Sequence, residues 1–118
     1  MVAWNNSRVA SRALQDAMPI LEQATEVVVL RINAKPTDQP TSMDVRDPLA
    51  RRGIKAESVR TAAQEVSPGD ALLSRAHDLG VDLIVMAAYD GSRIRESLVG
   101  GTTRLVLETM TRPVLLSH

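Results

Sequence analysis

The sequence contains no cysteine and no phenylalanine, and only one tryptophan and one tyrosine among its 118 residues. Without cysteine, the chain can form no disulfide, no thiolate metal site and no cysteine nucleophile. With so few aromatic residues, the core has to be built from Val, Leu, Ile, Ala and Met. This composition favours a parallel sheet covered by alanine-rich helices over a sandwich or a barrel.

An excess of charge of one sign is also missing. Fourteen basic and fourteen acidic residues give a formal net charge of zero, so nothing in the charge balance indicates nucleic acid or a membrane surface as partner. No apolar run approaches the roughly 20 residues of a membrane span, and the first residues lack the apolar core of a signal peptide. We therefore expect a cytoplasmic protein of a single domain, residues 1–118.

Apolar runs alternate with helical patterns along the whole chain. The expected strands are residues 2–4, 27–32, 54–61, 81–88 and 114–117, and the expected helices are residues 10–21, 43–52, 67–79 and 102–110. Right-handed crossovers between consecutive strands then give an α/β fold, a three-layer α/β/α sandwich around an open, five-stranded parallel sheet.

Three stretches are harder to interpret. Pro19 should bend the first helix or end its regular part. Residues 33–42 contain two prolines and almost no apolar anchor, which predicts a mobile surface loop. In residues 43–52, Thr41 and Asp44 have capping-box spacing, but a shorter helix that starts at Asp47-Pro48 and stops at Gly53 is equally compatible with the sequence.

The candidate site follows from the strand order. In open parallel sheets, ligands bind beyond the carboxyl ends of the strands, where the winding direction reverses. If the first and fourth strands flank that reversal, Trp4-Asn5 and Tyr89-Asp90 open into one crevice. Gly100-Gly101, before the last helix, can present backbone N–H groups to a phosphate there. The same pair can also serve only as a tight turn.

Other side chains near this crevice have two interpretations each. Thr102 and Thr103 suit either helix N-caps or phosphate ligands. Trp4 could stack on an adenine, but with so few large side chains available we expect it to pack. Arg93, Arg95 and Arg104 could attract an anion, although surface pairs with residues such as Glu96 are the expected arrangement.

Nothing in the sequence indicates catalysis. His77 lies on an expected helix, His118 is the last residue, and no serine has a base at a recognisable spacing. No cluster of His, Asp and Glu has the spacing of metal ligands. We therefore do not expect an enzyme.

Three segments carry a resemblance to a known family: VAWNNS, HDLGVDLIVMAAY and RIRESLVGGTTRLVLETMTRPVLLSH. On these segments nearly the whole chain resembles the universal stress protein family, the UspA-like branch of adenine-nucleotide-binding α/β domains. The resemblance implies the strand order 3-2-1-4-5. It also implies a homodimer paired through the last strand, Pro113 to Ser117, with an isologous contact through Val114 and Leu116, and ATP or AMP as ligand, with Mg for a triphosphate.

The nucleotide motif of the family is only partly present. Members that bind ATP carry G-x-x-G-x9-G-[S/T] after the fourth strand, and these positions fall here on Ala87, Asp90, Gly100 and Gly101. Only the third position matches. At the end of the first strand, Asn5-Asn6-Ser7 replaces the family's aspartate and glycine-serine. The candidate nucleotide-binding residues are Trp4, Asn5, Ile32, Met86, Ala87, Asp90, Gly91, Gly100, Gly101, Thr102 and Thr103.

Asp90 decides between two functions. A carboxylate about 5 Å from a phosphate oxygen is repelled by about 1 kcal/mol in water, and by about 3 kcal/mol at an effective dielectric constant of 20. Aspartate in a left-handed backbone adds about 1 kcal/mol, so triphosphate binding is weakened about ten- to a thousandfold. We therefore expect a stress-response dimerisation and regulatory domain with weak or lost ATP binding. The alternative is a functional ATP- or AMP-binding regulatory protein, with Mg bridging Asp90 to the phosphates.

Overall fold

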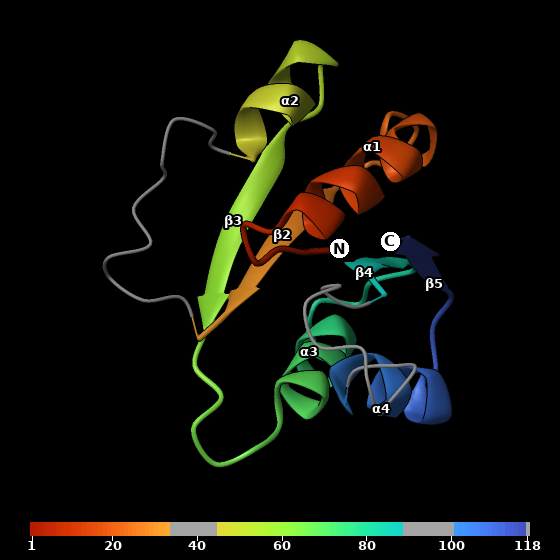
Figure 1. Cartoon of the computed structure of the whole chain (residues 1–118). Helices are drawn as coiled ribbons and strands as arrows, with labels where there is room; N and C mark the ends of the chain where they lie inside the picture. The colour runs from red at the N-terminus through yellow and green to blue at the C-terminus, as the bar shows by residue number, and fades with distance from the viewer. Residues whose placement is uncertain (34–44, 89–100, 118) are drawn as a thin grey trace.

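The computed structural model describes residues 1–33, 45–88 and 101–117. Within these residues, strands and helices alternate along the chain (Figure 1). The elements are β1 (Val2–Ala3), α1 (Arg8–Leu21), β2 (Val27–Ile32), α2 (Arg46–Arg51), β3 (Ala56–Thr61), α3 (Pro68–Asp78), β4 (Ile84–Ala87), α4 (Gly101–Thr109) and β5 (Val114–Ser117).

The strands form one five-stranded sheet in the order β3-β2-β1-β4-β5, and every neighbouring pair is parallel. Val2 of β1 pairs with Val29 on one side and with Val85 on the other. The outer pairs run from Val27↔Ala56 to Ile32↔Thr61 and from Ile84↔Val114 to Ala87↔Ser117. The predicted α/β fold and its strand order are therefore confirmed.

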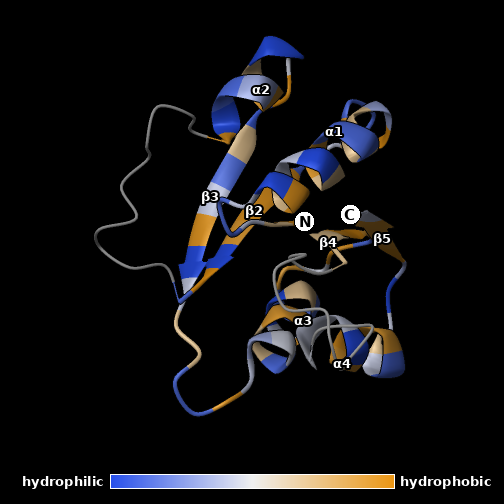
Figure 2. Cartoon of the chain, viewed as in Figure 1, coloured by the Kyte–Doolittle hydropathy of each residue, from blue (hydrophilic) through white to orange (hydrophobic). Residues whose placement is uncertain are grey.

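Helices cover both faces of the sheet, α1 and α2 on one side and α3 and α4 on the other (Figure 1). Side chains alternate between the two faces along each strand. Val27 and Val29 pack in the core beneath α1, whereas Val28 and Leu30 pack in the core beneath α3. Because both faces are buried, β2 is an almost continuous apolar strand (Figure 2).

Two helices begin after a serine cap, as the turn Asn5-Asn6-Ser7 and the run Ser67-Pro68-Gly69-Asp70 indicate in the sequence. Ser7 precedes α1, and its hydroxyl oxygen accepts a hydrogen bond from the backbone N–H of Ala10 at 3.1 Å. Ser67 precedes α3 in the same way and accepts from the N–H of Asp70 at 3.2 Å, with proline at the first helical position. Both caps satisfy donors that would otherwise have no partner in the first turn.

Several predicted boundaries are too wide. Val81 follows α3 and closes its end, because its N–H donates to the carbonyl of Ala76 at 3.0 Å, and β4 starts only at Ile84. Ile54 likewise closes α2 by donating to Leu49 at 2.9 Å, so β3 starts at Ala56. The first strand ends before Trp4, at Ala3.

The structure decides the bounds of the two helices that contain a proline, α1 and α2. The shorter alternative for residues 43–52 is close to the observed α2, which ends before Gly53, a residue with φ of 75°. Pro48 lies in the first turn of α2, where its missing N–H costs little. α1 ends at Leu21, two residues after Pro19. The predicted loop lies outside the described residues from position 34 onward, as do Thr41 and Asp44.

We predict that Ser67→Ala lowers the stability of the folded chain by about 1 kcal/mol, because the Asp70 N–H loses its side-chain acceptor. The midpoint of thermal unfolding should fall by about 4 °C. Ser74→Ala is the matched control, since Ser74 is an exposed residue within the same helix. Equal midpoints for the two variants would show that the cap contributes nothing.

Candidate functional site

The carboxyl ends of β1 and β4 meet at the centre of the sheet, because β1 lies between β2 and β4. The chain winds away from β1 in both directions, so this is the point at which open α/β sheets bind ligands. The start of α4 reaches the same place: the hydroxyl group of Thr103 donates a hydrogen bond to the carbonyl of Ala88, just after β4. The end of β1 and the start of α4 thus lie at the same edge of the sheet; that they open into one crevice stays a prediction from the sequence.

Trp4 forms the β1 side of the crevice and is largely part of the core. Its side chain is 9% exposed and packs in the apolar cluster beneath α1. The indole Nε1 donates to Oδ1 of Asn6 at 2.6 Å, and Asn6 has a φ of 61°, a left-handed conformation that asparagine tolerates. Since its donor is satisfied and its ring is packed, the packing interpretation of Trp4 is favoured.

Asn5 holds the turn that leads into α1. Its Oδ1 accepts from the backbone N–H of Ser7 at 3.1 Å and from the Ser7 hydroxyl at 2.6 Å. The Ser7 oxygen accepts in turn from Ala10, which couples Asn5 to the N-terminus of the helix. Because its oxygen is already used in this network, Asn5 has mainly its amide NH₂ group left to offer a ligand.

The opposite side of the crevice is formed by the start of α4. Gly101 is exposed, and a Cβ built on it would meet nothing within 4 Å, so packing in the described part of the chain does not require glycine here. Thr102 is half-buried and Thr103 is 4% exposed. The helix begins at Gly101, one residue earlier than predicted. Both threonines therefore lie inside its first turn, and an N-cap role for them is wrong.

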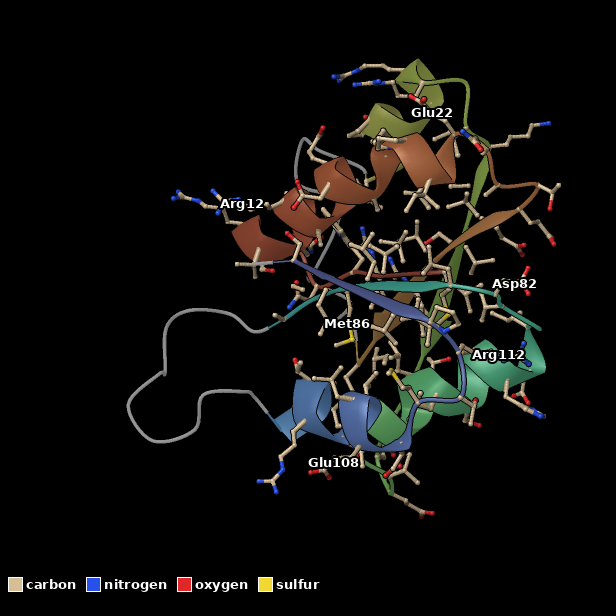
Figure 3. All side chains as sticks on the ribbon, turned by 90° about the vertical axis from the view of Figure 1, so that its right-hand side faces the viewer. Arg12, Glu22, Asp82, Met86, Glu108 and Arg112 are labelled. Atoms are coloured by element: carbon tan, nitrogen blue, oxygen red, sulfur yellow. The ribbon has the colours of Figure 1, made fainter. Side chains whose placement is uncertain are left out.

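The remaining candidates lie on the strands themselves. Ala87 is the half-buried last residue of β4 and pairs with Ser117. Ile32 is the half-buried last residue of β2 and packs on the α3 side of the sheet. Met86 is 5% exposed and lies between the sheet and the helices α3 and α4 (Figure 3). These side chains contribute apolar packing behind the crevice rather than polar groups within it.

Four residues of interest lie outside the described residues: Tyr89, Asp90, Gly91 and Gly100. The same holds for Arg93, Arg95 and Glu96. Their part in a phosphate-binding loop therefore stays a prediction from the sequence.

Arg104 is engaged on the surface of α4 rather than directed at an anion. Its Nε lies 2.9 Å from Oε1 of Glu108, one helical turn later, and both side chains are exposed. The hydrogen bond to Glu108, together with its negative charge, raises the pKa of Arg104 above its usual value. The predicted surface pairing is confirmed for this arginine, with Glu108 as its partner.

Two polar residues at the ends of the strands were not singled out from the sequence. Asn33, with φ of 55°, follows β2; its Oδ1 accepts from the N–H of Ala63 at 2.7 Å, which joins the ends of β2 and β3. Arg31 is only 7% exposed, and its Nε is buried without a hydrogen-bond partner in the described part of the chain. The visible signal for Arg31 was a charge inside an otherwise apolar strand.

The described residues offer little for catalysis. His77 lies near the end of α3, at the opposite end of the sheet from the crevice, and pairs weakly with Asp78 at 3.8 Å. Among residues 1–33, 45–88 and 101–117, no three His, Asp or Glu side chains gather closely enough to hold a metal ion. Within the same ranges, none of the helices has the length and apolar character needed to cross a bilayer.

Comparisons with known proteins agree with this geometry. The chain superimposes on MJ0577, the subject of a structure-based assignment of biochemical function, with a TM-score of 0.80 at 21% identity, covering 98% of this chain and 92% of that one. It also resembles the universal stress protein UspA from Lactobacillus plantarum, with a TM-score of 0.69 at 17% identity and coverage of 99% and 94%.

A third solved structure is a universal stress protein in complex with cAMP, with a TM-score of 0.73 at 18% identity and coverage of 99% and 94%. At these identities the likeness establishes the fold. The comparison with curated proteins gave no match. The family model described as "Universal stress protein family" matches residues 1–118. The chain therefore belongs to the universal stress protein family.

Proposed function

We propose that this chain is a dimerisation and regulatory domain of the stress response in which ATP binding is weak or lost. The observation that carries the proposal is the state of the polar groups at the described part of the crevice. The Trp4 indole, the Asn5 oxygen and the Thr103 hydroxyl are each hydrogen-bonded within the chain. A nucleotide would have to replace these hydrogen bonds by bonds of its own. Replacing one hydrogen bond by another contributes little to the free energy of binding.

The degenerate glycine motif supports the same proposal. Ala87 occupies the first glycine position and is held in the ladder between β4 and β5, where the next residue, Ala88, donates to the carbonyl of Ser117 at 2.8 Å. Asp90 occupies the second glycine position and adds a negative charge where phosphates would lie. Both replacements act against a triphosphate, one through reduced backbone freedom and one through repulsion.

The alternative is a regulatory protein that still binds ATP or AMP. Two observations favour it. A relative of the same fold was solved with cAMP, and α4 begins at an exposed glycine, at the end of a helix where N–H groups without a partner in the helix can bind an anion. Mg bridging Asp90 to the phosphates would offset the repulsion.

We predict weak or undetectable binding of Mg-ATP to the unmodified chain by calorimetric titration, with AMP and ADP titrated beside it. Asp90→Gly should tighten ATP binding by about ten- to a thousandfold, because it removes the carboxylate and frees the backbone. Asp90→Asn removes only the charge and separates the two contributions. Asp78→Asn, at the other end of the sheet, is the control for net charge. Micromolar affinity in the unmodified chain, unchanged by Asp90→Gly, would support the alternative.

We also propose that the chain forms a homodimer through the free edge of β5. All four residues of β5 are half-buried. The carbonyl of Pro113 accepts from Ile84 of β4, and that of Ser117 accepts from Ala88, which follows β4. Since backbone groups alternate in direction along a strand, the N–H and C=O groups of Val114 and Leu116 face the free edge. An unpaired apolar edge favours pairing with a second strand.

The dimer can be tested by removing one outward donor. Leu116→Pro deletes an edge N–H without removing a bond to β4, so we predict a dimer for the unmodified chain and a monomer for this variant. Leu116→Ala is the matched control, because it shortens the side chain but keeps the N–H, and it should remain dimeric. Size-exclusion chromatography with light scattering at micromolar concentration measures the mass. A monomeric unmodified chain would contradict the proposal.

A further inference from the structure

Arg31 is a buried cation without a partner near the carboxyl end of the central sheet. It is 7% exposed on β2, and its Nε has no hydrogen-bond partner in the described ranges. The ion pairs found there join Arg52 to Glu22, His77 to Asp78 and Arg104 to Glu108, and none of them includes Arg31. A guanidinium is charged under all conditions in which proteins fold, and burying it unpaired is costly. The unpaired Nε donor can be satisfied by an anion that reaches it.

The strand register places a second arginine beside it. Arg31 pairs in register with Arg60 of β3, which is exposed. Side chains an even number of residues apart on a strand lie on the same face of the sheet. Val29 and Ala56 pack in the core beneath α1 and α2. Arg31, two residues after Val29, and Arg60, four residues after Ala56, therefore project toward the same face. Trp4 lies next to Arg31 on the side away from Arg60. It directly follows β1, and its N–H donates to the carbonyl of Leu30 at 2.9 Å.

We propose that Arg31 and Arg60 form a binding site for a phosphate group. Two adjacent guanidinium groups match a doubly charged anion and can donate several N–H bonds to its oxygens. Arg31 is the penultimate residue of β2, so the anion enters from the carboxyl edge of the sheet, where Arg60 is open to solvent. An anion there would also offset the repulsion between the two like charges.

This site is separate from the glycine motif. The motif leads into α4, which lies on the opposite face of the sheet (Figure 1). β1 separates β2 from β4, so the arginine pair lies on the other side of the crevice. Asp90→Gly should therefore leave phosphate binding at Arg31 unchanged. Failure of ATP binding at the glycine motif would not affect the proposed site at Arg31, and the reverse also holds.

The test compares variants in the presence and absence of inorganic phosphate, with chloride at matched ionic strength. Millimolar phosphate should raise the unfolding temperature of the unmodified chain, because it binds only the folded state. Arg31→Gln and Arg60→Gln should each weaken phosphate binding by about tenfold or more in calorimetric titration. Arg52→Gln is the matched control, since this exposed arginine pairs with Glu22, and it should retain the phosphate response.

Arg31→Met provides a second readout. Without phosphate, this variant should be at least as stable as the unmodified chain, because it replaces an unpaired buried charge by an apolar side chain of similar length. With phosphate, the unmodified chain should gain stability and Arg31→Met should not. The difference between their unfolding temperatures should therefore shrink to zero or change sign. Ribose 5-phosphate and AMP distinguish free phosphate from a phosphorylated metabolite, and Arg31-dependent binding of any of the three supports the proposal.

Two results would overturn it. An equal response of every variant to phosphate would show an adventitious ion only. A marked loss of stability in Arg31→Met without phosphate would show that Arg31 already has a partner within the folded chain, and that its role is structural.

Discussion

The pairing of β1 with both β2 and β4 is the constraint on which the rest of the structure depends. Only two residues, Val2 and Ala3, form this strand; both pair with β2, and Val2 also pairs with β4. Because the chain leaves β1 at the point where the winding reverses, the turn that follows Ala3 lies at the carboxyl edge of the sheet. The turn from Trp4 to Ser7 and the start of α4 are neighbours for this reason and not through any direct bond between them.

The polar groups near the ends of β1 and β4 already form hydrogen bonds within the folded chain. Asn5 and Ser7 organise the first turn of α1, Asn6 holds the indole of Trp4, and Thr103 joins α4 to the end of β4. Each of these bonds satisfies a group that would otherwise be left without a partner as the helices pack. A domain whose site residues are used in this way can keep its family's architecture while its affinity for nucleotide declines.

The distribution of charge across the crevice differs from that of a simple triphosphate site. An acidic residue, Asp90, stands in the glycine motif that would receive phosphates. Two basic residues, the buried Arg31 and the exposed Arg60, lie in register on β2 and β3, on the other side of β1. If both features act as we propose, the chain has moved its preference for anions from α4 to the β2–β3 side. A single charge about 5 Å from a phosphate, at an effective dielectric constant of 20, is enough to change the affinity for the phosphate by about an order of magnitude or more.

The sequence by itself determined the fold class, the strand order through family resemblance, and the helix starts at Ser7 and Ser67, because local hydrogen bonding and apolar periodicity act over a few residues. Only the tertiary structure decided the boundaries at Val81 and Ile54, whose N–H groups close the preceding helices. It alone showed that the Trp4 indole donates to Asn6, that the Thr103 hydroxyl donates to Ala88, and that Arg31 is buried in register with Arg60. Burial and pairing across strands depend on residues far apart in the chain, which no local pattern records.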